Sequence, residues 1–198
     1  TKAEPLTLDG VDAVTSMYPF EKASTLSASD DTDIERIAEV GWRTARLCAN
    51  ETYMDCPYYE QLQYFGDTRI QTMITMFNTR DSLMVRQALE MGEQSMTSDG
   101  LTQSRYPSSV LQMISSYSLS WCGMVYDYWM YRDDPKEVKR LLPSVRRILA
   151  WYEQFLREDG SLEKIPYWFF CDWAAGFPMG TPIRQDDGYS AYQDLALL

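Results

Sequence analysis

The sequence predicts an all-α protein, a helical toroid built from paired helices. In several segments apolar residues recur at steps of three and four, which is the period of an amphipathic helix. Capping residues, Pro and Gly separate these segments. Short turns alternate with longer loops, and a toroid of hairpins accommodates such loops at one mouth better than a compact bundle does. The chain shows no fixed-length repeat motif of the tetratricopeptide or ankyrin type.

The first third of the chain is predicted to contain an irregular segment and two helices. Residues 1–30 contain Pro, Gly and a Ser-rich run without a clear period, so we expect an irregular lead-in. A helix is expected to begin after Asp31, whose side chain can cap the first amides, and to end near Ala49. A loop over 54–67 follows, and the next helix is expected over 68–77.

The remainder is predicted to be helical up to a loop-rich stretch. Helices are expected over 82–96, 110–131 and 137–157. Pro135 suits the start of the last of these, because its missing N–H has no helical partner there, and Pro143 can kink the helix. Residues 161–187 form loops, with a possible short strand over 167–171. A final helix is expected from Ser190 and has no cap at the end of the chain, which predicts a piece of a longer polypeptide.

The composition limits the partners, metal ligands and catalytic groups that the protein can use. The net charge of −11 disfavours binding to nucleic acid, and there is no long uncharged apolar run for crossing a membrane. Histidine is absent, which excludes Ser-His-Asp and Cys-His catalysis and removes the commonest metal ligand. We therefore expect neither metal nor cofactor, and we expect proton transfer by carboxylates, of which there are 29.

Residues 51–69 are the segment richest in reactive side chains, with four carboxylates and four tyrosines. A carboxylic acid near apolar rings can stay protonated and act as a general acid. Ionised carboxylates can bind sugar hydroxyls through charge-assisted hydrogen bonds, and tyrosines can stack on a sugar ring. The segment therefore predicts a carbohydrate site.

The spacing of Asp55-Cys56-Pro57, Glu60 and Gly66-Asp67 resembles the signature loop of glycoside hydrolase family 78, the bacterial α-L-rhamnosidases. The resemblance covers most of residues 32–198. It implies an (α/α)6 six-hairpin barrel, present here as its N-terminal part over 31–198. It also implies that Glu60 is the general acid and that Asp55 and Asp67 bind rhamnose hydroxyls. Hydrolysis would proceed with inversion, using a downstream Glu base that these residues do not contain.

Two residues depart from the family pattern and predict a divergent branch. Tyr59 stands where family members often have Arg, and Tyr64 stands where they often have Trp. Both are expected near the sugar. The departures keep open a different sugar specificity or a non-catalytic carbohydrate-binding relative. The hairpin layout and the acidity are also compatible with a helical interaction scaffold.

Other interpretations of the loop residues are structural. Glu60 can be a solvated loop carboxylate, Asp55 can cap a turn before Pro57, and Asp67 can cap a helix beginning at Thr68. Arg69 can pair with a loop carboxylate and set its pKa, or it can be a plain surface residue.

Four further residues are expected to contact substrate, namely Arg69, Trp121, Asp172 and Trp173. Asp172 and Trp173 follow an aromatic run, and an unpaired buried Asp172 would be costly, so this pair is expected at the rim of a wet cleft. Trp121 can form a stacking platform on its helix, although core packing explains it equally well.

Partners and location follow from the resemblance. The expected partner is a carbohydrate, with no nucleic acid and no membrane. A partial barrel would expose apolar surface, so self-association through its open face is expected. The residues themselves do not fix the localisation, and relatives of this kind suggest a periplasmic or extracellular protein.

Overall fold

Helices form the regular structure of the chain, as predicted. A computed structural model describes residues 6–162 and 165–181. Its elements, in chain order, are α1 (Thr32–Leu47), α2 (Phe65–Asn78), α3 (Leu83–Gln94), α4 (Ser115–Tyr131), α5 (Pro135–Glu153) and the short 3-10 helix η1 (Pro178–Gly180). Within the described ranges, β-pairing is limited to isolated bridges. The all-α class is therefore confirmed, and it agrees with part of a six-hairpin glycosidase domain.

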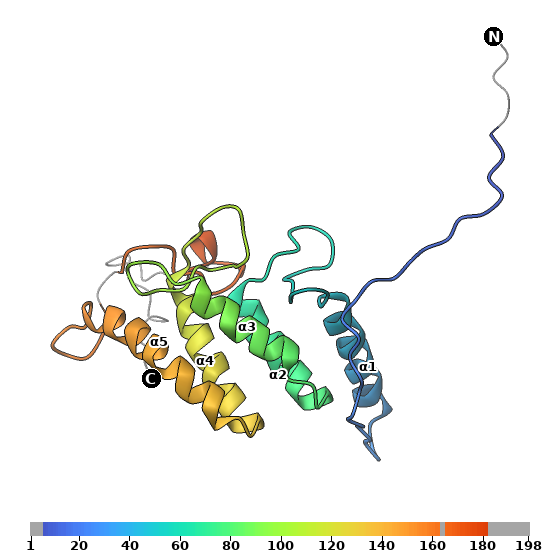
Figure 1. The fold of residues 1–198 in the computed structure, drawn as a ribbon, viewed down its shortest axis with the longest axis horizontal. Helices are drawn as coiled ribbons and strands as arrows, with labels where there is room; N and C mark the ends of the chain where they lie inside the picture. Colours follow the sequence, from blue (N-terminus) through green and yellow to red (C-terminus); the bar gives the residue numbers. More distant parts are fainter. Residues whose placement is uncertain (1–5, 163–164, 182–198) are drawn as a thin grey trace, which may run out of the picture.

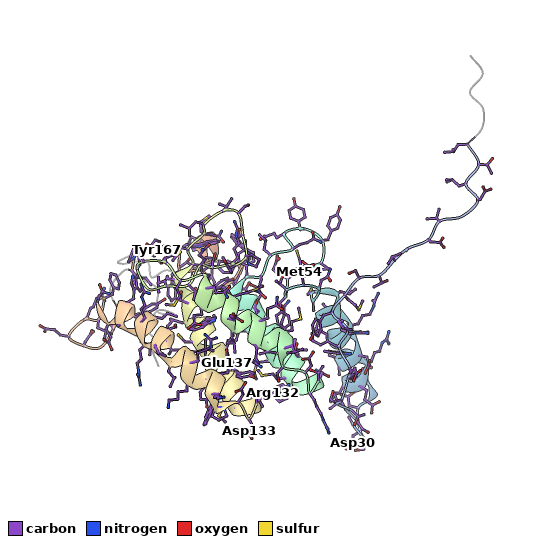
Figure 2. The ribbon with its side chains drawn as sticks, in the orientation of Figure 1. Asp30, Met54, Arg132, Asp133, Glu137 and Tyr167 are labelled. Atoms are coloured by element: carbon purple, nitrogen blue, oxygen red, sulfur yellow. The ribbon has the colours of Figure 1, made fainter. Side chains whose placement is uncertain are left out.

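The helices are arranged as hairpins with all their long loops at one end (Figure 1). α4 packs against α2, α3 and α5, and α1 packs against α2. Residues 79–82 and 132–134 form short turns at one end of the layer. Residues 48–64 and 95–114 form long loops at the other end, which they share with the segment after α5. Figure 2 shows the same polarity, with Met54 and Tyr167 at the loop end and Asp133 at the turn end.

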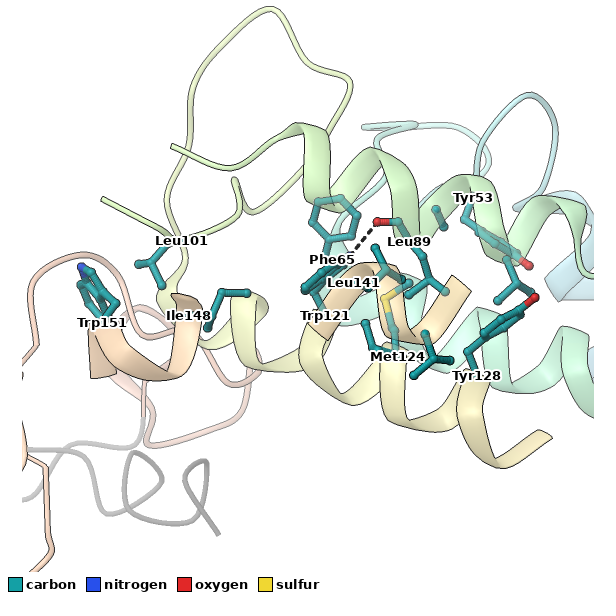
Figure 3. Packing of buried hydrophobic residues seen from close by; sticks show 14 of the residues in the cluster. Tyr53, Phe65, Leu89, Leu101, Trp121, Met124, Tyr128, Leu141, Ile148 and Trp151 are labelled. Atoms are coloured by element: carbon teal, nitrogen blue, oxygen red, sulfur yellow. Dashed lines mark hydrogen bonds between the residues drawn. The ribbon is translucent and has the colours of Figure 1, made fainter. Parts of the chain in front are cut away.

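A continuous apolar core joins α2, α3, α4 and α5 (Figure 3). Its largest buried side chains include Phe65, Leu89, Trp121, Tyr128 and Leu141. Full burial of one such aliphatic or aromatic side chain contributes about 1.5–3 kcal/mol. This core fixes the helices that carry the loop end.

Trp121 belongs to this core. Its exposed fraction is 0%, and its indole N–H donates to the carbonyl of Leu89 at 3.0 Å. Gly92 on α3 makes room for the indole, because a methyl group on Gly92 would overlap the ring. The expectation that Trp121 forms a sugar-stacking platform is therefore wrong, and the core alternative is the one observed.

Several helix boundaries differ from the sequence predictions. α1 begins after Asp31, whose carboxylate accepts from the amide of Asp33 at 2.9 Å, as expected. α2 begins at Phe65 instead of Thr68, so Asp67 lies inside the first turn and makes no N-cap. α5 continues through Pro143.

The loop-rich end of the chain was only partly predicted. The possible strand over 167–171 does not form. In this segment Trp168 makes a single parallel bridge with Ile114. The helix expected from Ser190 lies outside the described residues. The lead-in has no regular structure over 6–31, but it contacts the helical layer, where the amide of Tyr18 donates to the carbonyl of Ala49 at 2.9 Å.

Candidate functional site

A cavity of about 480 Å³ opens at the loop end of the helices. Its charged lining residues are Asp55, Glu60, Asp67 and Asp172, and its aromatic lining residues are Tyr64, Tyr117, Trp168, Phe170 and Trp173. The carboxylates come from the loop before α2, from α2 itself and from the segment after α5. The cavity thus combines acidic groups from these three parts of the chain with aromatic rings, one of which, Tyr117, comes from α4.

Asp55 closes the loop that presents Glu60. The backbone amide of Asp55 donates to the carbonyl of Leu62, and the Asp55 carboxylate accepts from the amide of Leu62, both at 2.9 Å. Residues 56–61 are thereby closed into a loop at its base. Within the loop, Gln61 adopts a positive φ of 55°, and its side-chain amide donates to the carbonyl of Pro57 at 3.0 Å. Glu60 is exposed to solvent and lines the cavity together with Tyr64, whose pKa it helps to raise.

Asp67 lies half-buried in the first turn of α2, where the helix dipole favours a negative charge. Burial raises the pKa of Asp67, and the nearby charges of Asp55 and Glu60 raise it further. Hydrogen bonds from its own amide and from the Tyr117 hydroxyl act in the opposite direction. Gly66 permits this arrangement, because a methyl group there would overlap the Tyr117 ring.

Arg69 pairs with α4 and not with the loop. Its Nε donates to Asp127 Oδ2 at 2.8 Å, and its Nη2 donates to Asp127 Oδ1 at 3.4 Å. Gly123 leaves space for the guanidinium group. The expected pairing with a loop carboxylate is therefore wrong, because position 69 faces the neighbouring helix. Arg69 lines a second cavity of about 440 Å³, which shares Asp67 and Asp172 with the first.

Aromatic rings form one wall of the cavity. The centroid of Phe170 lies 5.0 Å from that of Trp168 and 5.2 Å from that of Trp173. The Trp168 indole donates to the carbonyl of Met179 at 2.8 Å, while the Trp173 ring is 69% exposed. Such rings offer apolar faces to a ligand at the edge of water.

A family model for the bacterial alpha-L-rhamnosidase 6 hairpin glycosidase domain matches residues 21–190. The chain belongs to this family.

Two solved structures resemble the six-hairpin domain. A GH78 family rhamnosidase of Bacillus sp. GL1 superposes with a TM-score of 0.78 at 24% identity, covering 91% of this chain and 18% of that one. A rhamnosidase from Klebsiella oxytoca with rhamnose bound superposes with a TM-score of 0.69 at 20% identity, covering 84% of this chain and 32% of that one. At these identities the likeness shows the fold. A comparison with curated proteins gave no match.

The six-hairpin domain brings most of the predicted site residues together. Asp55, Glu60, Tyr64 and Asp67 line the cavity, as does the rim pair Asp172 and Trp173. Tyr59 is 89% exposed and does not line it, because the closed loop turns its side chain into solvent. The roles of the lining residues stay predictions.

Five lining residues were not predicted from the sequence. Tyr117, Trp168 and Phe170 supply rings, Ile114 supplies an apolar side chain, and Gln112 supplies an amide. Trp168 and Phe170 belong to the same aromatic run as Asp172, which was the available signal. Tyr117 and Gln112 carry no local signal. Tyr117 lies on α4, which packs on α2, and Gln112 lies in the loop before α4.

Within residues 6–162 and 165–181, no group of three or more Cys, Asp or Glu side chains is placed to hold a metal ion. No helix in the described ranges has the length and apolarity needed to cross a membrane.

Proposed function

We propose that this domain provides the acid-bearing part of an α-L-rhamnosidase active site. The observation that supports it most is the convergence of Asp55, Glu60 and Asp67 on one cavity lined by aromatic rings. Its volume of about 480 Å³ suits a small ligand, for which sites usually measure about 300–1,000 Å³. Both solved relatives are named rhamnosidases, and one is described with rhamnose bound.

Each residue has a role in the proposed reaction. Glu60 gives a proton to the departing glycosidic oxygen, for which its exposed place on a loop beside the cavity is suitable. Asp55 and Asp67 accept hydrogen bonds from sugar hydroxyls, which are strong because the acceptors are charged. The exposed face of Trp173 stacks on the apolar face of the sugar ring.

Inversion requires a second carboxylate. In inverting glycosidases a base activates water on the opposite face of the sugar, about 6.5–9.5 Å from the acid. We propose that this base comes from another part of the complete enzyme, since the chain spans 18% and 32% of the two solved relatives.

Sugar binding to this chain tests the proposal. L-rhamnose is titrated into the protein while tryptophan fluorescence is followed, because Trp168 and Trp173 line the cavity. We expect Asp55→Asn and Asp67→Asn each to weaken binding by about tenfold or more, the effect of losing about 1.4 kcal/mol from a charged hydrogen bond. Asp133→Asn, at the turn end of the helices, is the control and should bind normally. Normal rhamnose binding by both cavity variants would contradict the proposal.

A different sugar specificity is the second proposal, and Tyr64 favours it. Tyr64 lines the cavity at the position where the family pattern often has Trp, so the ring that meets the ligand is smaller and carries a hydroxyl. The same titration with L-fucose, D-mannose and D-glucose separates the two proposals. Tighter binding of one of these sugars than of L-rhamnose would favour the second.

A further inference from the structure

The Tyr64 hydroxyl lies between two charged side chains. Arg105 Nη1 donates to the hydroxyl oxygen at 2.5 Å, and the guanidinium carbon lies 5.3 Å from the centroid of the Tyr64 ring. Glu60 lines the same cavity as Tyr64 and is one of the groups that raise the pKa of the Tyr64 hydroxyl. Arg105 therefore contacts Tyr64, and Tyr64 neighbours Glu60 at the cavity.

Backbone pairing holds Tyr64 and Arg105 next to each other. Tyr64 and Arg105 form an antiparallel bridge. The amide of Phe65 donates to the carbonyl of Ser104 at 3.0 Å, and the amide of Tyr106 donates to the carbonyl of Gln63 at 3.2 Å. The loop over 95–114 is thus fastened to the start of α2 on both sides of Tyr64.

The chemistry of the three groups fixes the direction of the hydrogen bonds. A guanidinium group is always charged and only donates, so the phenol oxygen accepts from Arg105. The single hydroxyl proton of Tyr64 is then available to an acceptor at the cavity, where Glu60 lies. Burial and the interaction with Glu60 raise the pKa of Tyr64 to about 12, although Arg105 lowers it. Tyr64 is therefore a neutral donor at all pH values well below 12.

The other charged groups around Glu60 are negative. Asp55 comes from the same loop, Asp67 from α2 and Asp172 from the opposite wall. The guanidinium of Arg69, in the adjoining cavity, is paired with Asp127. Arg105 is the cation that hydrogen bonds with Tyr64, the tyrosine that lines the cavity together with Glu60.

We propose that Arg105 is a positioning residue for Glu60 and acts through Tyr64. The catalytic meaning of this inference rests on the proposed function, in which Glu60 becomes an anion after giving up its proton. A donor held against that anion stabilises it, and Arg105 orients and polarises the donor. Arg105 itself touches no substrate.

The test follows the side-chain carboxyl carbon of Glu60 by ¹³C NMR in the intact chain, at fixed pH. The signal is assigned by its loss in Glu60→Gln. We expect Tyr64→Phe to displace it and Arg105→Met to displace it at least half as far. The double variant should move it no further than Tyr64→Phe alone, because both changes remove the same path through Tyr64. Arg105→Lys, which keeps a charged donor, should restore most of the original position.

Arg43→Met is the matched control, since Arg43 is exposed on α1, and it should leave the signal unchanged. If Arg105→Met loses its dispersed amide spectrum, Arg105→Gln takes its place in the series. The proposal is overturned if the folded Arg105 variant behaves like Arg43→Met, or if the displacement in the double variant equals the sum of the two single displacements.

Titration of the same samples with L-rhamnose separates this proposal from the function on which it rests. If the Arg105 variant displaces the Glu60 carbon signal but the protein does not bind rhamnose, the positioning role is supported and the rhamnosidase proposal is contradicted. If the protein binds rhamnose but the Arg105 variant leaves the Glu60 signal in place, the rhamnosidase proposal is supported and the positioning role is contradicted.

Discussion

Asp67, for which we propose a role in sugar binding, also lowers stability when it is ionised. Because its pKa is raised by burial, the folded protein binds this proton more tightly than the unfolded chain does. Its contribution to stability is therefore present below the unfolded pKa and is lost as the pH rises through the folded pKa. We expect Asp67→Asn to melt above the wild type at pH 7 by about 2–4 °C, the shift that roughly 1 kcal/mol produces at this size.

Calorimetry at several pH values checks this expectation. The difference in Tm between Asp67→Asn and the wild type should shrink as the pH is lowered towards 3, because the wild-type carboxyl then becomes protonated. Asp33→Asn, which removes an exposed carboxylate from the first turn of α1, controls for the loss of charge at a helix start. A wild type that melts above Asp67→Asn at every pH would contradict the argument.

Individual side chains were predictable where a motif specified them. Asp55, Glu60 and Asp67 were recognised by their spacing, and they do line one cavity. Arg69 was recognised, but its partner was not, because sequence spacing does not show which helix its side chain faces. The partner, Asp127, is 58 residues away along the chain and is 6% exposed.

At the scale of elements, α3 and α4 approach closely at Gly92. A methyl group there would overlap the Trp121 indole, which is enclosed by the core. We expect Gly92→Ala to destabilise the chain by about 1–3 kcal/mol, the usual effect of overpacking. Chemical denaturation measures the change.

Gly41→Ala is the matched control for that substitution. Gly41 also lies within a helix, α1, but the space around its missing side chain is open for 4 Å. There the higher helix propensity of Ala should stabilise the chain by up to about 1 kcal/mol. Equal effects of the two substitutions would show that the indole contact is unimportant.

The existence of α1 to α5 followed from apolar periodicity, whereas η1 was not predicted and several starting points were not either. α4 begins at Ser115, five residues after the predicted position 110. Residues at this start are hydrogen bonded outside the helix. The amide of Ser104 donates to the carbonyl of Gln112 within the preceding loop, and the amide of Ser115 donates to the carbonyl of Trp168, which is far away in the sequence. These bonds compete with helix formation, and no apolar period reveals them.

At the scale of the whole molecule, α4 and α5 expose an apolar groove. A cavity of about 470 Å³ there is lined by side chains such as Val125, Trp129, Val138 and Leu142. The Trp129 side chain is 52% exposed. We expect the isolated chain to self-associate through this face, since large exposed apolar patches favour contact.

Sedimentation velocity at increasing concentration tests that expectation. Trp129→Glu should shift the chain towards monomer by about tenfold or more in dissociation constant, as a charge would lose its hydration at the contact. Leu83→Glu, which places the same charge at a 67% exposed apolar position on α3, should have little effect. A wild-type chain that stays monomeric would contradict the expectation.

The pair of hydrogen bonds between Asp55 and Leu62 has an evolutionary consequence. Since the loop is tied at its neck, the residues at its tip, Tyr58 and Tyr59, are 86% and 89% exposed and support nothing beneath them. Mutations can accumulate at these two positions while Glu60, two positions before Leu62, keeps its place. Related proteins can therefore differ at the positions of Tyr58 and Tyr59 and still keep the loop closure between Asp55 and Leu62.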